Sequence, residues 1–522
     1  MTAPPPPDIS YCSVLAMIRQ HAKARPYQDC LVAIDQNVSI TWQQLYRLTN
    51  KLSAWLHDRD IGANDRVLVL TDNSLENLIL YFGVQRHGAT FCTVNVDINA
   101  NHIREMISRL SPRLVLWHDA LNMGGLADGM TGEWVSFGSA DVHGENSSDG
   151  GLFEILNGYD GEDEPREVSA ESDASVICFT SGTTDRPKGV IHSFGNYNFI
   201  GAQTAYLWGL TPEDRVLEYR SFSWSSSHQI VLQPLLIGGG CVVFASKFSF
   251  SSLFDWIAEH RITKAIGIPA VVNMLLDQPD EGRIAVPDHL QFMSCSTAPL
   301  MEEQHRRFER VYNMQLIQHY GMSEGGTVAG NHHQARKIGS VGMPGIGQNL
   351  TIVDEDGNFQ PRGMEGEIEI GGPQNATAYL NPDGSIEEVR GKRLKTGDLG
   401  VLDEDGYLRV TGRAKDLVIR GGVNIAPLEI DNAIMKHDDV MEACTIGVPD
   451  DIYGEALVCY VVPRTNRLLT ADMIKSHCSA VLPDFKQPSE IRIVDDIARN
   501  DRGKPDRNTM KNLWLSENGE TA

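Results

Sequence analysis

The fold and the function of this chain are decided by one stretch, Thr180-Ser181-Gly182-Thr183-Thr184-Asp185-Arg186-Pro187-Lys188-Gly189. It follows a strand-like run, Ala174 to Phe179, and combines small hydroxyl residues, glycines and a lysine. Backbone N–H groups, hydroxyl groups and an ammonium on one loop can bind a polyphosphate. The Walker spacing G-x-x-x-x-G-K-[ST] is absent, so an ordinary P-loop ATPase or GTPase is not indicated. Taken alone, the stretch is also compatible with a solvated turn.

The residues before this loop alternate between strand and helix patterns. Apolar residues at positions i, i+3, i+4 and i+7 predict an amphipathic helix with Ser74 as its N-cap. They are Leu75, Leu78, Ile79 and Phe82. Short buried strands are expected on either side, at Arg66 to Thr71 and at Thr90 to Val94. This order favours a largely parallel sheet covered by helices, and the same texture resumes at Ala265 to Ile268 and Gln291 to Ser294. The stretch Asp141 to Asp173 is rich in Gly, Ser, Asp and Glu and is expected to be a loose surface connection.

The pattern changes after about residue 340. Turn signals such as Asp354-Glu355-Asp356-Gly357 separate short β-rich runs, which predicts an antiparallel, barrel-like subdomain. Beyond Gly412-Arg413 about a hundred residues have their own pattern and predict a small α+β domain. We therefore expect a large domain over 1–413 and a small, mobile α+β domain over 414–522, in an α/β protein whose large domain combines parallel-type α/β subdomains with the barrel-like one.

Composition limits the class of protein. The chain has 522 residues, enough for at least two domains, and its net charge of −24 argues against nucleic acid or an anionic membrane as a partner. The nine cysteines form no CxxC pair, so neither a zinc site nor a disulfide framework is indicated. There is no secretory signal pattern and no apolar run of about 20 residues, so we expect a cytoplasmic protein without a membrane span.

Further motifs carry groups suited to nucleotide chemistry. In Gln318-His319-Tyr320-Gly321-Met322-Ser323-Glu324, an aromatic ring can stack on adenine, a hydroxyl can contact a phosphate, and a carboxylate can bind Mg²⁺. The stretch Lys395-Thr396-Gly397-Asp398 places a carboxylate after a strand, which suits hydrogen bonds to two ribose hydroxyls. Each motif alone could be an ordinary turn.

Together, in this order, these motifs resemble those of the acyl-adenylate-forming superfamily, which includes acyl-CoA synthetases, peptide-synthetase adenylation domains and beetle luciferases. The resemblance covers nearly the whole chain. It implies an ATP- and CoA-dependent ligase with Mg²⁺ on Glu324, catalytic contacts from Lys504, Glu324 and Ser323, and a hinge at Lys415. The nucleotide-binding residues that it implies are Thr180, Ser181, Gly182, Thr183, Thr184, Lys188, His319, Tyr320, Gly321, Asp398, Arg413 and Lys504.

The same resemblance locates the other two substrates. It implies an acyl pocket at Trp224, His228, Ser296 and Gly325, and a tunnel for CoA beside Gly421 and Gly422. The residues around Trp224 are mostly serines, and none of them is an Asp that could pair with a substrate ammonium. This counts against an α-amino acid as the substrate. Aromatic, alicyclic, medium-chain and polar acids all stay open, and a packed or solvated His228 is the main alternative to substrate contact.

The implied reaction has two halves, the formation of acyl-AMP and the attack of a thiol on it. No carrier-protein segment follows Lys504, so we expect a free-standing ligase that uses CoA. The main alternative is a stand-alone adenylating enzyme that loads an acyl carrier protein. A luciferase, or a sensor that binds nucleotide without catalysis, is a further alternative, and a homodimer is possible. An α/β hydrolase is disfavoured because there is no G-x-S-x-G elbow.

Overall fold

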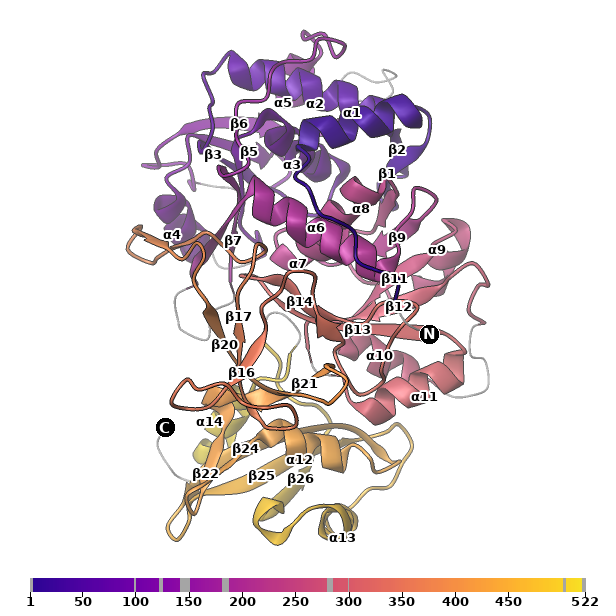
Figure 1. The fold of residues 1–522 in the computed structure, drawn as a ribbon, viewed down its shortest axis with the longest axis vertical. Helices are drawn as coiled ribbons and strands as arrows, with labels where there is room; N and C mark the ends of the chain where they lie inside the picture. The colour runs from indigo at the N-terminus through magenta and orange to yellow at the C-terminus, as the bar shows by residue number, and fades with distance from the viewer. Residues whose placement is uncertain are drawn as a thin grey trace.

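The computed structural model describes residues 3–97, 100–121, 125–140, 151–180, 187–278, 285–298, 300–500 and 504–518. Within these ranges the chain forms a large domain and, below it in Figure 1, a smaller one built from the last strands and helices. The prediction of a mixed α/β protein with a large N-terminal and a small C-terminal domain is confirmed.

One of the two large sheets has nine strands in the described residues. In order across the sheet these are β15 (Met343–Pro344), β14 (Gly326–Gly330), β13 (Gln315–Met322), β12 (Phe292–Cys295), β11 (Lys264–Gly267), β9 (Arg215–Glu218), β10 (Cys241–Phe244), β1 (Asp29–Ala33) and β2 (Val38–Thr41). The strands from β13 to β1 run parallel, and β2, β14 and β15 are antiparallel to their neighbours. The carboxyl ends of the parallel strands therefore meet at one edge, where ligands bind in such sheets.

The second large sheet has eight strands in the same part of the chain. They are β19 (Ile386–Glu388), β18 (Ala378–Leu380), β8 (Gly189–Ser193), β7 (Ala174–Phe179), β4 (Thr90–Thr93), β3 (Arg66–Leu70), β5 (Leu114–His118) and β6 (Glu133–Phe137). The expected strands around residues 66–71, 90–94 and 174–179 are all present, and β3, β4 and β7 run parallel as predicted.

Helices cover both faces of each large sheet. The largest core cluster takes residues from both sheets and from the helices between them. These helices are α1 (Val14–Ala24), α2 (Trp42–His57), α3 (Leu75–His87), α5 (Leu152–Leu156), α6 (Phe194–Trp208) and α8 (Gln233–Gly238). The outer face of the nine-stranded sheet packs against α9 (Leu253–Glu259), α10 (Pro269–Leu276) and α11 (Glu302–Tyr312), and that of the eight-stranded sheet packs against α4 (Ala100–Leu110).

Helix α6 is defined by local signals at both ends and leads to the functional region. Ser193 and Asn196 form a capping box at its start, and Gly209 ends it with a left-handed backbone at φ 57°. A side chain on Gly209 would overlap the imidazole of His333, so both conformation and space favour glycine there. The helix thereby places Trp208 against the nine-stranded sheet, 5.7 Å from the ring of Phe292.

Helix α3 differs from the amphipathic helix that its apolar spacing predicted. Ser74 is its N-cap, as expected, but every residue of the helix is buried, including Glu76 and Arg86. Arg86 donates hydrogen bonds to Asn50 and Ser53 of α2, and Glu76 accepts one from Gln36. Its polar residues are thus satisfied by other elements inside the protein and do not mark a solvent-facing side.

The segment after residue 340 is antiparallel, as predicted. Within the described residues, four strands form the row β16 (Thr351–Val353), β17 (Gly366–Ile370), β20 (Leu394–Leu402) and β21 (Leu408–Arg413). The strands β18 and β19, which lie between β17 and β20 in the sequence, pair instead with the eight-stranded sheet. The antiparallel segment is therefore joined to the parallel part of the large domain.

The small domain has its own sheet and two apolar clusters. Its strands are β23 (Val423–Ile425), β22 (Val418–Arg420), β25 (Gly454–Pro463), β24 (Val440–Asp450) and β26 (Glu490–Ile493). Its helices are α12 (Pro427–Ile434), α13 (Ala471–Val481) and α14 (Arg507–Glu517), with a 3₁₀ turn at Asp484–Lys486. Contacts with the large domain include a hydrogen bond from Thr465 to Asp277 and one from Asn424 to Glu355.

The stretch from 141 to 173 was expected to be a loose surface connection. Residues 141–150 lie outside the described ranges, but residues 151–173 are partly packed: α5 contributes Leu152 and Phe153 to the core, and Glu162 and Glu164 pair with Arg47 and Arg19. All nine cysteines are free thiols, and all but Cys12 are buried. In the described part of the chain, no helix has the length and apolar content needed to cross a membrane.

The buried Arg86 provides a test of the core. The pKa of Arg86 is lowered to about 10 by burial, and its side chain contacts neutral partners, chiefly the Asn50 carbonyl. We expect Asn50→Ala to lower the free energy of unfolding by about 3 kcal/mol, because it leaves a buried guanidinium without its acceptor. Urea unfolding followed by tryptophan fluorescence measures the change. The control is Arg47→Ala on the same helix, which removes an exposed ion pair and should change stability by at most about 0.5 kcal/mol. Equal effects of the two substitutions would contradict this account.

Candidate active site

Three predicted nucleotide-binding side chains are joined by hydrogen bonds. Tyr320 of β13 donates to Asp398 Oδ2 at 2.6 Å, and the Arg413 Nε donates to Asp398 Oδ1 at 2.8 Å. Asp398 and Arg413 are cross-strand partners on β20 and β21. Burial, and then the charge of Asp398, raise the pKa of the Tyr320 phenol, so it stays a neutral donor. The cluster thus presents a fixed carboxylate and a half-exposed guanidinium next to an aromatic ring.

Asp398 was predicted to follow a strand, but Tyr320 and Asp398 both lie within strands. Strand β13 continues through Tyr320 to Met322, and β20 extends on both sides of Asp398. Thr396 also supports the carboxylate, because its hydroxyl accepts a hydrogen bond from the Asp398 N–H at 3.1 Å. A side chain held within a strand has less freedom than one on a turn, so Asp398 is more rigid than the sequence indicated.

The base of the Thr180 loop lies in the hairpin between β7 and β8. The Thr180 N–H donates to the Lys188 carbonyl at 2.9 Å. The Lys188 ammonium lies 5.1 Å from the centre of the Tyr379 ring and 4.0 Å from Glu387. Burial, and then the negative charge of Glu324, raise the pKa of Tyr379. Four of the predicted phosphate-binding residues lie outside the described ranges: Ser181, Gly182, Thr183 and Thr184.

Ser323 is held from two directions. Its hydroxyl is 2.8 Å from the Ser225 hydroxyl, on the loop that carries Trp224. Its carbonyl accepts hydrogen bonds from His192 at 2.8 Å and from the Gln229 amide at 3.0 Å. Ser323 therefore connects the strand with Tyr320 to the loop that was predicted to line the acyl pocket.

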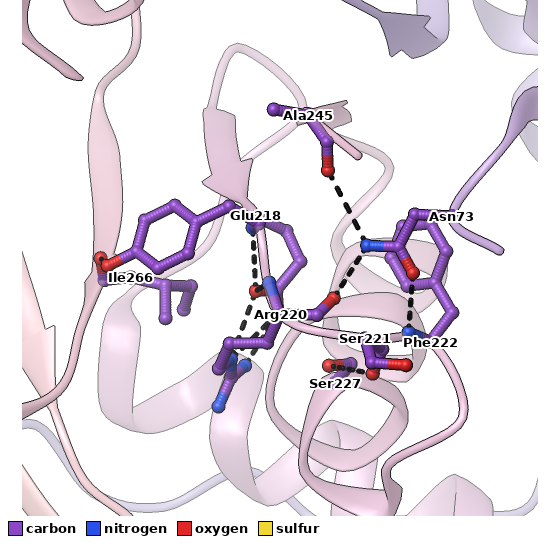
Figure 2. Close-up of polar contacts among 9 residues, drawn as sticks. Asn73, Glu218, Arg220, Ser221, Phe222, Ser227, Ala245 and Ile266 are labelled. Carbon is purple, nitrogen blue, oxygen red and sulfur yellow. Dashed lines mark hydrogen bonds and ion pairs between the residues drawn. The ribbon is translucent and has the colours of Figure 1, made fainter. Parts of the chain in front are cut away.

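That loop is fixed to the core by one asparagine. The Asn73 side chain donates to the Arg220 carbonyl at 2.8 Å and accepts from the Phe222 N–H at 2.7 Å, as Figure 2 shows. After Trp224 come the short helix α7 (Ser225–Ser227) and a π-helix at His228–Leu232. Helices of the π type are rare and occur often at functional sites.

His228 is a core residue. It is fully buried, its Nε2 lies 2.6 Å from the Phe222 carbonyl, and its Nδ1 lies 3.2 Å from the Tyr197 hydroxyl. Burial lowers the pKa of His228 to about 4. The packed alternative considered above accounts for both nitrogens, and a contact between His228 and substrate stays a prediction.

The other residues assigned to this region occupy tight positions. Gly321 and Gly325 leave little space, since an added Cβ would lie 2.4 Å from the Gly326 carbonyl oxygen and 2.7 Å from Ile370 respectively. Ser296 and His319 are buried, and the Ser296 hydroxyl and the His319 Nε2 make no hydrogen bond to the described residues. These two side chains are considered further below.

The predicted elements of the small domain form three separate features. Lys415 is exposed in a 3₁₀ turn (Ala414–Asp416) directly after β21. Gly421 and Gly422 form the exposed turn between β22 and β23, with φ of 58° and 81°. Lys504 closes a hairpin: its N–H donates to Asn500 Oδ1 at 3.1 Å, and its carbonyl accepts from the Asn500 N–H at 2.9 Å. The backbone of Lys504 is thus held within the small domain.

Residues on both sides of Lys504 are anchored by ion pairs. Arg499 pairs with Glu442 of β24, and Arg507 pairs with the buried Asp431 of α12 at 2.5 Å. The sequence analysis missed these anchors, as it missed Asn73, Tyr379 and the pair formed by Glu218 and Arg220. The one visible signal for that pair was an acidic residue directly after the apolar residues Val216 and Leu217 and two positions before an arginine.

Comparison with known proteins identifies relatives over the whole length. A family model described as AMP-binding enzyme matches residues 18–380, and one described as AMP-binding enzyme C-terminal domain matches residues 429–504. The chain is 29% identical to a sulfoacetate–CoA ligase of Cupriavidus necator over 98% of this chain and 100% of that protein. It is 30% identical to an indoleacetate–CoA ligase of Aromatoleum aromaticum, over 95% and 97% respectively.

Solved structures share the fold. ATP-bound MatB from Rhodopseudomonas palustris has 25% identity and a TM-score of 0.85, covering 96% of this chain and 99% of that chain. The anthranilate CoA ligase AuaEII in complex with anthranoyl-AMP has a TM-score of 0.86 at 21% identity, with 98% of each chain covered.

The histidines around Ser323 provide a pH test. Burial lowers the pKa to about 4 for His192 and His228 and to about 3 for His319, where the charge of Arg220 adds to the effect. In the unfolded chain each would take up a proton near pH 6.5, so stability falls as the pH drops from 6.5 towards 4. At pH 5.5 the expected loss is about 1.4 kcal/mol for each histidine.

NMR of protein labelled at the histidine Cε1 measures this directly. The signals of His192, His228 and His319, assigned by single substitutions, should not shift between pH 8 and 5.5, because burial lowers the pKa of each ring well below that range. Titration of the three buried rings in that range would contradict the description of the site.

Proposed function

The chain belongs to the family of AMP-binding enzymes, and from this membership we propose that it joins a small carboxylic acid to coenzyme A through an acyl-AMP intermediate. It is an AMP-forming acid–thiol ligase that uses ATP and CoA. The observation that carries the two-step proposal is the hydrogen-bonded cluster of Tyr320, Asp398 and Arg413, in which Tyr320 lies on the strand that leads to Ser323. It offers the donors and acceptors that a ribose and a phosphate require.

The first half-reaction requires positioning more than a protein nucleophile. A carboxylate oxygen of the acid bonds to the α-phosphorus of ATP, and the bond from phosphorus to the bridging oxygen breaks, releasing pyrophosphate with the electron pair. In the proposed arrangement Asp398 accepts hydrogen bonds from the ribose, Tyr320 lies against adenine, and Ser323 donates to the α-phosphate. Lys188 and the Thr180 loop neutralise the departing pyrophosphate, and Lys504 bridges the substrate carboxylate and the α-phosphate.

The donor set near Glu324 fits magnesium delivered with the nucleotide. In the residues that the structure describes there is no group of three or more His, Cys, Asp or Glu able to hold a metal ion. One carboxylate, completed by phosphate oxygens and water, is the coordination that Mg²⁺ adopts in such sites. When bound there, Mg²⁺ would offset charge on the phosphates, and Glu324 would be its protein ligand.

The second half-reaction requires a different arrangement of the small domain. The thiol of CoA attacks the acyl carbon, the bond to the AMP oxygen breaks, and the thiol proton passes to solvent. We place the domain boundary after Arg413 and the hinge at the exposed Lys415, since a short solvated turn can change φ and ψ without disturbing a core. Rotation there would exchange Lys504 for the Gly421–Gly422 turn, beside which CoA would enter.

The relatives and the cysteines support proposals about the class of acid and the cellular compartment. The relatives named above act on sulfoacetate and on indoleacetate, so both a polar and an aromatic acid are compatible with this family. The free, mostly buried thiols fit a reducing compartment, and we propose the cytoplasm. The homodimer stays a prediction.

A substrate panel tests the activity. The purified protein is supplied with ATP, Mg²⁺ and a set of carboxylic acids, each with and without CoA, and AMP release is measured. We expect AMP only when CoA and one class of acid are both present. Acid-dependent exchange of pyrophosphate into ATP without stimulation by CoA would instead favour the loading of a carrier protein. Absence of any acid-dependent reaction would contradict the proposal.

The role of Lys504 is tested by separating the half-reactions. Lys504→Ala should lower acyl-AMP formation by about 100-fold, the effect of removing one preorganised charged donor, and should leave the reaction of supplied acyl-AMP with CoA nearly unchanged. Pyrophosphate exchange measures the first and thioester formation the second. Lys436→Ala, an exposed lysine of the same domain, is the matched control. Equal loss in both half-reactions would contradict the assignment.

A further inference from the structure

Several buried polar side chains lie on one face of the nine-stranded sheet at its carboxyl end. Leu217, Ala265, Met293 and Leu316 are in register across β9, β11, β12 and β13, and they face the helices α9 to α11. Because strand side chains alternate, the next residue of each strand faces α6 instead, and these residues include Glu218 and Ser294. Within β13 the same holds for His319, and Arg220 and Ser296 follow directly after the ends of β9 and β12. Trp208 of α6 confirms the face, since its ring lies 5.9 Å from that of His319.

The Arg220 guanidinium is held rigidly by Glu218. Its Nε lies 3.0 Å from Glu218 Oε1, and its Nη2 lies 2.6 Å from Oε2. The same carboxylate accepts the backbone N–H groups of Tyr219 and Arg220 at 2.9 and 2.8 Å. Glu218 is fully buried and Arg220 is 4% exposed. Four N–H groups donate to this carboxylate, so Glu218 does not interact with the guanidinium alone.

One end of this guanidinium makes no hydrogen bond to the part of the chain that the structure describes. The Arg220 Nη1 is buried and has no partner among the described residues, and Figure 2 shows a guanidinium nitrogen directed away from Glu218. Three other atoms are also buried without a hydrogen-bond partner among the described residues: the hydroxyl oxygens of Ser294 and Ser296 and the His319 Nε2. Leaving a buried donor unsatisfied costs about 1–3 kcal/mol, and more for a charged group. Such a concentration of unsatisfied polar groups at the carboxyl ends of β9, β12 and β13 indicates a ligand that brings acceptor oxygens.

These donors lie close to the reacting end of the proposed site. His319 precedes Ser323 by four residues, which places their Cα atoms at most about 13 Å apart along a strand. The loop that begins at Arg220 continues to Ser225, whose hydroxyl is 2.8 Å from that of Ser323. An acid with its reacting carboxylate near Ser323 would therefore extend its other end towards Arg220.

We propose that Arg220, with Ser296 and His319, binds a second anionic group, a carboxylate or a sulfonate, at the end of the acid remote from the reacting carboxylate. This assignment rests on the function proposed above and narrows it to small acids with two acidic groups. A guanidinium matches the planar or tripodal oxygens of these groups, and its hydrogen bonds to an anion are about twice as strong as neutral ones. A neutral His319 adds a donor or acceptor without a further charge.

The test compares acids of equal length in the full-length enzyme with ATP, Mg²⁺ and CoA. Sulfoacetate and the dicarboxylic acids from oxalate to adipate are measured against the matching monocarboxylic acids and the monomethyl esters of the diacids. We expect kcat/KM for AMP release to be at least 10-fold higher for one or more of the dianionic acids than for its singly charged counterparts. A preference for a monocarboxylic acid or an ester would overturn the proposal while leaving the ligase activity in place. Silence with every acid would overturn both.

Variants of Arg220 complete the test. Arg220→Gln should lower kcat/KM for the preferred dianionic acid on the order of 100-fold, the loss of one or two charged hydrogen bonds, and should abolish the preference over the ester. Because this variant leaves Glu218 buried without its partner, the double variant Glu218→Gln with Arg220→Met, which removes both charges, is measured as well. Unchanged ATP binding shows that each variant is folded.

Arg215→Gln provides the matched control, because Arg215 begins β9, the strand that ends at Glu218, two residues before Arg220. It should keep the preference for the dianionic acid. If Arg220→Gln and the double variant both keep that preference while still binding ATP, Arg220 does not contact the acid and the assignment is wrong.

Discussion

The hydrogen bond from Tyr320 to Asp398 is the contact on which the arrangement of the site depends. It joins β13 of the nine-stranded sheet to β20 of the antiparallel sheet, two elements that are 78 residues apart in the sequence. Arg413 binds the other oxygen of the same carboxylate and is the last residue of β21, directly before the turn with Lys415. One carboxylate therefore fixes the geometry of both sheets at the proposed nucleotide site and of the segment that precedes the proposed hinge.

The order of the elements and the positions of the motifs could be predicted from the sequence because they depend on local signals. Ser74 marks the start of α3, and the turn residues after 340 mark an antiparallel region, since capping and turn chemistry act over a few residues. The burial of α3 could not be predicted, because the partner of Arg86 is Asn50 on another helix. The pairing of β18 with β8 depends equally on contacts between segments distant in the sequence.

In the site, too, local motifs could be predicted and contacts between distant segments could not. The chemistry of Tyr320, Ser323 and Asp398 was visible in the motifs, but the supports were not. Asn73 holds the loop before Trp224 from a position about 150 residues earlier, and Tyr379 lies by Lys188 through the pairing of β18 with β8. Spacing in the sequence carries no signal for such contacts. They are nevertheless what turns a set of suitable groups into a fixed arrangement.

The two domains use buried charge for different purposes. In the small domain, Asp431 and Arg507 form a buried ion pair that anchors α14, which begins three residues after Lys504, against α12. In the large domain, Glu218 uses only part of the hydrogen-bonding capacity of Arg220 and leaves its Nη1 unsatisfied. An ion pair that only stabilised the fold would have every donor satisfied, because an unsatisfied buried donor lowers stability. Apolar side chains of similar volume are often at least as stable as a buried ion pair, so stability alone does not require the pair. The unsatisfied end of Arg220 is therefore explained by recognition of a ligand, in the part of the site where the acid must be distinguished from others.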